Sequence, residues 1–204
     1  TQSGSIVEEL EVRGEDMEGI AWHPEYETLW VVEERQREII EYDTLGQILS
    51  RFQVDVERRN ENDGLEGIAI NTRNHHIFVA NEKNPRRLVE LDAQGNQLRK
   101  VPVDFGLDDE ARGLDLSGLH YDDVHDWLWL ISDEARAIFV IDPDGRPLAA
   151  FQSDVQDLEG ITVLHEQQRI AAVSDDLQRL VYFDLPDPLL HLPRRVGTST
   201  SAAR

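Results

Sequence analysis

Four anchor glycines, Gly19, Gly67, Gly118 and Gly160, recur at intervals of roughly 40 to 50 residues, and each follows a residue whose side chain carries oxygen. The residues before the glycines are Glu18, Glu66, Ser117 and Glu159. If the repeats surround one axis, three carboxylates and one hydroxyl converge there. Carboxylates packed together raise one another's pKa unless a cation or hydrogen-bond donors compensate them. An all-oxygen set favours Ca²⁺, and Zn²⁺ is less favoured because no histidine occupies this position. The three glutamates are therefore candidate metal ligands.

A second acidic position follows the second hydrophobic run of each repeat. It is occupied in turn by Glu34, Glu82, Asp133 and Asp175, and the residues just before it are Glu33, Asn81, Ser132 and Ser174. Because neighbouring residues on a strand point to opposite faces, only one of these two sets should face a central channel. The uninterrupted acidic set is the better candidate. Together with Ser117, it predicts ligand-binding residues at the channel mouth.

The same residues also have a structural interpretation. A glutamate beside a glycine turn can accept backbone N–H bonds and link adjacent repeats, so four copies would be four links. The sequence leaves both interpretations open. The seven histidines form no known catalytic or metal-binding motif, and His23, His75 and His165 fall in turns, where we expect surface positions. No catalytic residue can be assigned.

Each repeat is predicted to consist of strands. In the first repeat, four β-branched, aromatic or apolar runs are separated by Pro, Gly and polar residues: Gly19–Trp22, Thr28–Val32, Arg37–Tyr42 and Gln47–Val54. An inner apolar strand, two middle strands and a half-solvated outer strand are typical of a propeller blade. We therefore predict an all-β propeller of four four-stranded blades. The tryptophans at 22, 30, 127 and 129 are expected in its core.

The last repeat lacks an outer strand, because a segment with three prolines follows Asp184. The segment "GSIVEELEV" (Gly4–Val12) aligns with the outer strand "GQILSRFQV" (Gly46–Val54). We predict that this N-terminal strand closes the last blade and removes a sheet edge. Residues 4–186 then form one domain, and 187–204 form a C-terminal extension, poorly ordered at its end. The alternative is a fragment of a five-bladed ring.

Composition limits the classes of partner. The 204 residues carry a formal net charge of −21, which disfavours nucleic acid and anionic membranes and favours cations or basic partners. The same acidity also serves solubility. The absence of cysteine excludes disulfides, thiol catalysis and thiolate metal sites. No run reaches transmembrane length, so no direct membrane insertion is expected. The oligomeric state is left open.

The repeated pattern "EGIA…LWVVEE…IIEYD" resembles the SdiA-regulated (YjiK-like) bacterial propellers over roughly Ser5–Asp184. The likeness includes "NEKNP" (Asn81–Pro85) and "DLSGLHYD", in which serine replaces the glutamate in matching order. The resemblance implies a β-propeller associated with the bacterial envelope or periplasm, with the cytoplasm not excluded, and no defined reaction. It also implies five repeats, whereas four are found here. A more distant likeness to calcium-dependent lactonase and esterase propellers would make Glu18 a metal ligand, as an analogy at the level of the fold.

Two functions are consistent with these observations. The first is an acidic binding or scaffold propeller, which holds an unknown protein or small molecule and binds Ca²⁺ at its centre. The second is a Ca²⁺-dependent esterase or lactonase, in which the metal polarises a carbonyl. Near-identical residues in every repeat favour binding, because catalysis requires an asymmetric set of groups.

Overall fold

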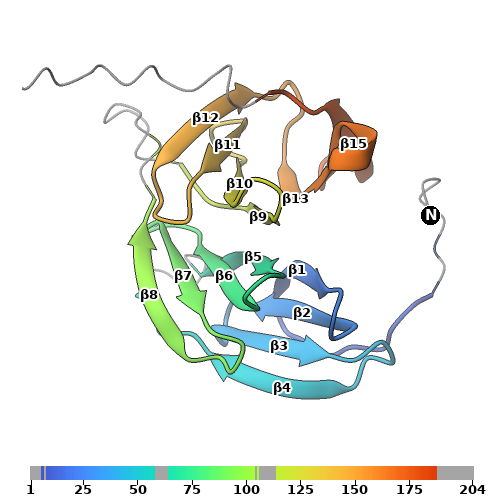
Figure 1. The fold of residues 1–204 in the computed structure, drawn as a ribbon. Helices are drawn as coiled ribbons and strands as arrows, with labels where there is room; N and C mark the ends of the chain where they lie inside the picture. Colours follow the sequence, from blue (N-terminus) through green and yellow to red (C-terminus); the bar gives the residue numbers. More distant parts are fainter. Residues whose placement is uncertain (1–5, 7, 58–63, 104, 106–113, 188–204) are drawn as a thin grey trace, which may run out of the picture.

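Each repeat folds into one antiparallel sheet whose strands lie side by side in chain order (Figure 1). The computed structural model describes residues 6, 8–57, 64–103, 105 and 114–187. The first sheet contains β1 (Met17–His23), β2 (Thr28–Glu33), β3 (Glu38–Tyr42) and β4 (Ile48–Gln53). The second contains β5 (Leu65–Asn71), β6 (His76–Asn81), β7 (Arg87–Leu91) and β8 (Gln97–Pro102). The third contains β9 (Gly118–Asp122), β10 (Trp127–Ser132), β11 (Ala137–Ile141) and β12 (Pro147–Gln152). The fourth contains β13 (Leu158–Leu164), β14 (Arg169–Ser174) and β15 (Arg179–Asp184), with a 3₁₀ turn, η2 (His165–Gln167), between β13 and β14.

One recurring turn attaches the outer strand of each of the first three blades. An aspartate, Asp43, Asp92 or Asp142, accepts backbone N–H bonds from the residues two and four positions later. The glycine three positions later has a φ of +78° to +81°, a conformation that residues with a Cβ rarely adopt. The same Asp-x-x-Gly chemistry therefore places β4, β8 and β12 equivalently.

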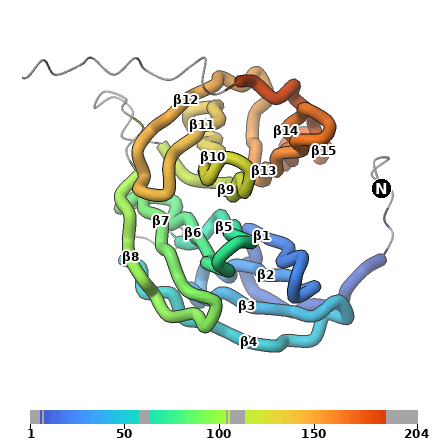
Figure 2. Tube along the Cα trace, in the orientation of Figure 1, coloured from blue at the N-terminus to red at the C-terminus, as the bar shows by residue number. Residues whose placement is uncertain are grey.

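The blades pack face to face through their inner strands. β1 lies against β5, β5 against β9, and β9 against β13, as Figure 2 shows. Apolar clusters fill each interface, around Trp30 and Ile77 between the first two blades, Phe78 and Phe139 between the next two, and Trp129 between the last two. The prediction of a four-bladed β-propeller is confirmed. Within the described ranges, no helix has the length and apolarity required to cross a bilayer.

The predicted closure of the last blade is wrong for the residues that the structure describes. The fourth sheet has three strands there, and residue 6 and residues 8–12 form no strand, while residues 4, 5 and 7 lie outside the described part. Leu10, Glu11 and Val12 instead lie beside Gly46 of the first blade. Val12 packs there against a buried cluster of the first blade. This burial explains why residues 10–12 associate with the first blade rather than the fourth.

The first and fourth blades consequently flank an open side of the ring (Figure 1). β1 and β13 make no contact comparable to those between the other neighbouring inner strands that the structure describes. Ile20 and Trp22 on β1 are 62% and 47% exposed, and Leu180 and Tyr182 on β15 are also exposed. Trp30 and Trp129 are buried as predicted, but Trp22 is not in the core, because no blade covers this side of β1. Of the predicted extension 187–204, all but Asp187 lies outside the described residues.

Candidate functional site

The three glutamates that precede the anchor glycines come together. Glu18 on β1, Glu66 on β5 and Glu159 on β13 line one cavity of about 770 Å³. Asp175 and Arg179 line the same cavity from the open side, between the end of β14 and the start of β15. Ser117 lies deeper, in a smaller cavity of about 150 Å³ that it shares with Glu18 and Glu159. The structure thus groups these side chains as the repeat spacing indicated.

Backbone irregularities explain how the three glutamates reach the cavity. The pairing register shifts between Met17 and Ile20, between Leu65 and Gly67, and between Leu158 and Gly160. Each shift coincides with one of the glutamates. A β-bulge leaves a residue unpaired and changes the direction of its side chain. The third blade shows no such shift between β9 and β10, and its equivalent residue, Ser117, precedes the strand.

The carboxylates in this region destabilise one another's charged forms. Burial, followed by the charges of Glu18, Glu82 and Glu34, raises the pKa of Glu66 to about 9. Burial, followed by the nearby charge of Asp133, raises the pKa of Glu159 to about 7. The pKa of Glu18 is also raised, chiefly by burial. A bound cation would relieve this repulsion.

Glu34 connects two groups of possible ligand atoms. Asp16, Glu18 and Glu34 can each place a carboxylate oxygen within 4.8 Å of the others, and so can Glu34, Glu66 and Glu82. Glu34 is 5% exposed, and burial raises its pKa to about 7, although a hydrogen bond from the Gly64 N–H lowers it. Glu159 belongs to neither group, although it lines the same cavity.

Asp16 does not belong to either of the repeated positions from which the candidate ligands were predicted. The sequence does contain a signal for it. An aspartate stands two residues before Glu18, Ser117 and Glu159, namely Asp16, Asp115 and Asp157. In the second repeat, Gly64 occupies the equivalent position, two residues before Glu66. The Nε of Arg35 donates a hydrogen bond of 2.8 Å to the Asp16 carboxylate.

Several of the repeated polar residues link adjacent blades, as the structural interpretation predicts. Glu34 accepts the Gly64 N–H at 3.0 Å, and Asp133 accepts the Asp157 N–H at 2.8 Å, in each case at the entry to the next blade. The Ser117 hydroxyl donates to the Leu158 carbonyl at 3.0 Å. Asp133 and Ser117 therefore serve the architecture directly.

The remaining predicted residues are placed differently. Lys83 lies 2.5 Å from Glu82 and 3.0 Å from Glu134, so the protein supplies a cation beside Glu82. Asp175 is exposed, and no blade follows it in the described residues. By contrast, the described part of the chain provides no side-chain hydrogen bond or ion pair to Glu18, Glu66 or Glu159 within the usual distance limits. Glu18, Glu66 and Glu159 therefore lack a compensating side-chain partner in the described part of the chain.

Comparisons with known proteins agree with this architecture. The family model described as SdiA-regulated matches residues 47–152. Among solved structures, hydrazine synthase from Kuenenia stuttgartiensis is 14% identical with a TM-score of 0.57, over 89% of this chain and 50% of that one. A protein of unknown function from Bacteroides caccae is 11% identical with a TM-score of 0.54, over 82% of this chain and 60% of that one. At these identities the likeness concerns the fold alone, and the chain spans about half of these structures' lengths.

Proposed function

The chain belongs to the SdiA-regulated family, and on this premise we propose that it is a binding propeller whose channel mouth takes up Ca²⁺. The observation that carries the proposal is that Glu34 places a carboxylate oxygen within 4.8 Å of Glu18 in one group and of Glu66 in another. Glu18 and Glu66 also line one cavity and have no side-chain donor among the described residues. Ca²⁺ takes six to eight oxygen ligands, and carboxylates supplemented by water provide them. Glu159 and Asp175, on the far side of the cavity, contribute negative potential.

The symmetry of the site favours binding over hydrolysis. Acyl transfer requires a nucleophile and a base that differ in kind and lie within hydrogen-bond distance of each other. Ser117 carries the one hydroxyl among the four residues that precede the anchor glycines. It is buried and already donates a hydrogen bond to the Leu158 carbonyl. The bound cation then acts by joining β1 to β5 and by presenting a positive centre to an anionic group of a partner.

Ca²⁺ should stabilise the metal-stripped wild-type protein against heat. At a hundredfold excess over the dissociation constant, one site adds about 2.7 kcal/mol, which corresponds to roughly 5 °C or more for a chain of this size. The double variant Glu18→Gln, Glu66→Gln should lose this response. Thermal unfolding with and without millimolar Ca²⁺, followed by circular dichroism, measures both.

The matched control is Glu57→Gln with Glu166→Gln. Both of these glutamates are exposed and lie outside the cavity lining, so the double substitution replaces the same number of carboxyl groups by amides without touching the site. This control should respond to Ca²⁺ like the wild type. If the wild type does not respond, or if all three proteins respond equally, the carboxylates hold no specific Ca²⁺ and serve the architecture.

A further inference from the structure

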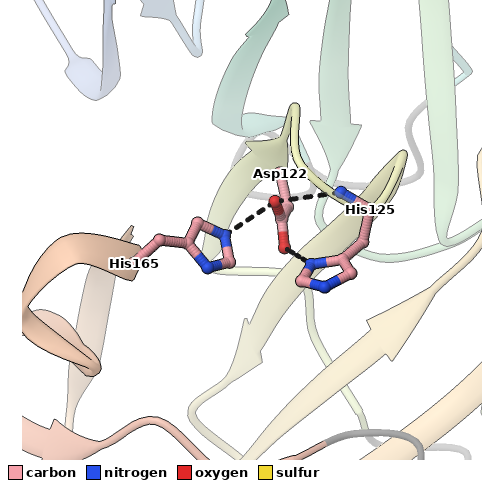
Figure 3. A group of neighbouring side chains, drawn as sticks. All are labelled: Asp122, His125 and His165. Atoms are coloured by element: carbon pink, nitrogen blue, oxygen red, sulfur yellow. Dashed lines mark hydrogen bonds and ion pairs between the residues drawn. The ribbon is translucent and has the colours of Figure 1, made fainter.

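A second polar cluster lies at the other end of the inner strands. Asp122 ends β9, His125 lies in the turn that follows it, and His165 begins η2 after β13. Figure 3 shows the two imidazoles approaching one carboxylate from different blades. His125 Nδ1 is 2.9 Å from Asp122 Oδ2, and His165 Nε2 is 2.8 Å from Asp122 Oδ1. Ser117 and Glu159 stand at the opposite ends of β9 and β13, so this cluster is separate from the carboxylate cavity.

The carboxylate does not depend on the histidines for its hydrogen bonds. The side chain of Asp122 is 0% exposed. Its Oδ1 accepts the backbone N–H of Val124 at 2.9 Å, and its Oδ2 lies 3.3 Å from the indole N–H of Trp129. These donors fix the orientation of the carboxylate and leave acceptor positions on both of its oxygens. The two imidazole nitrogens converge on these positions.

Both histidines are also held by contacts outside the cluster, His125 through its ring and His165 through its backbone. The His125 ring stacks on Trp127, with centroids 4.5 Å apart and planes 13° from parallel. The carbonyl of His165 accepts hydrogen bonds from both the backbone and the side-chain nitrogen of Gln168. Ligand groups whose orientation is fixed by a surrounding shell lose little entropy when they bind an ion.

From this geometry we propose that Asp122, His125 and His165 bind one Zn²⁺, which fastens the third blade to the fourth. Two imidazole nitrogens and one carboxylate oxygen form a ligand set that zinc commonly takes, with water in the fourth position. The three ligand atoms lie within 4.8 Å of one another. Tetrahedral zinc at about 2.0 Å from each ligand needs them about 3.3 Å apart. The two nitrogen–oxygen separations are now 2.9 and 2.8 Å, so each of them has to widen by only about half an ångström.

The electrostatic surroundings favour a cation. Asp122 contributes the carboxylate of this cluster, in a chain whose formal net charge is −21. Zinc binding at this position would stabilise the blade that has an open edge and the fewest strands in the described structure.

Isothermal titration calorimetry of zinc binding to the chelator-treated protein tests the proposal. Millimolar Ca²⁺ is kept present to occupy the carboxylate cavity. The wild type should bind one Zn²⁺ per chain, and His125→Ala and His165→Ala should each weaken binding at least tenfold. Glu66→Gln should leave zinc binding unchanged, so that failure of this proposal is distinguishable from failure of the Ca²⁺ proposal.

The matched control is His76→Ala. His76 Nδ1 lies 2.7 Å from Glu90, and its side chain is 28% exposed, against 27% for His165. Among the described residues, however, a single histidine contacts the Glu90 carboxylate. This variant should bind zinc like the wild type. Cobalt provides a second readout on the unmodified protein, because tetrahedral Co²⁺ with imidazole ligands shows visible absorption bands. The proposal is overturned if the two histidine substitutions leave zinc binding unchanged, or if cobalt gives an octahedral spectrum. Asp122, His125 and His165 would then be a hydrogen-bonded link between blades.

Discussion

Replacing Gly19 by alanine should destabilise the protein by about 3 kcal/mol, although it adds a single methyl group. A Cβ at this position would lie 2.3 Å from the backbone oxygen of Glu66 on the neighbouring blade. The φ of Gly19 is not in the left-handed region, so the cost arises from packing and not from backbone conformation. Because the contact is with backbone, no side-chain rotation relieves it, and β1 must separate from β5. Urea unfolding of both proteins measures the difference.

Gly160→Ala is the matched control, since Gly160 occupies the same position in the fourth blade. A Cβ there would meet the Cγ2 of Val173 at 2.8 Å, within its own blade. Val173 is 45% exposed, so its methyl group can move aside. We expect a loss of no more than about 1 kcal/mol. Equal losses at the two positions would contradict the view that these glycines exist to bring neighbouring blades together.

The four-bladed fold was predictable from the sequence, whereas the closure of the last blade was not. Repeat spacing and strand alternation are local properties, and they were sufficient to predict four blades. Which blade receives a terminal segment depends on competing tertiary contacts. The segment Gly4–Val12 has the pattern of an outer strand, but Val12 is packed against the first blade. Trp22 follows the same logic, because a strand pattern does not reveal whether a neighbouring blade covers it.

The candidate site was predictable to a similar extent. Alignment of the repeats identified Glu18, Glu66 and Glu159, because each blade places the same position at the channel. It could not reveal the bulges that direct these side chains, since a bulge is a property of pairing with β2, β6 and β14. The cluster around Asp122 was missed for a different reason. Its members occupy unequal positions in two repeats, and the prediction that His165 is a surface residue overlooked its contact with a buried carboxylate.

The metal-free protein should lose stability as pH rises from about 5 to about 9. The folded protein holds the pKa of Glu66 at about 9, well above the ordinary value of 4.5. Between these values the folded state retains a proton that the unfolded chain releases, so each step up in pH favours unfolding. Below the ordinary value both states are protonated, and the contribution vanishes. Allowing for solvent screening of a partly exposed group, the loss at pH 9 is on the order of 2 kcal/mol.

Glu66→Gln should remove most of this slope between pH 7 and 9, because an amide supplies a neutral group of the same shape at every pH. Below pH 7 a slope should remain, because the pKa values of Glu34 and Glu159 are raised to about 7. At pH 8 without Ca²⁺, the variant should therefore be more stable than the wild type. Ca²⁺ should reverse that order, because it binds the ionised carboxylate and so stabilises the wild type more strongly as pH rises. Urea unfolding at pH 5, 7 and 9, with and without Ca²⁺, measures both effects. Parallel pH profiles for the two proteins would show that Glu66 is ionised and compensated in the folded state, which would remove the electrostatic basis for a cation at the channel mouth.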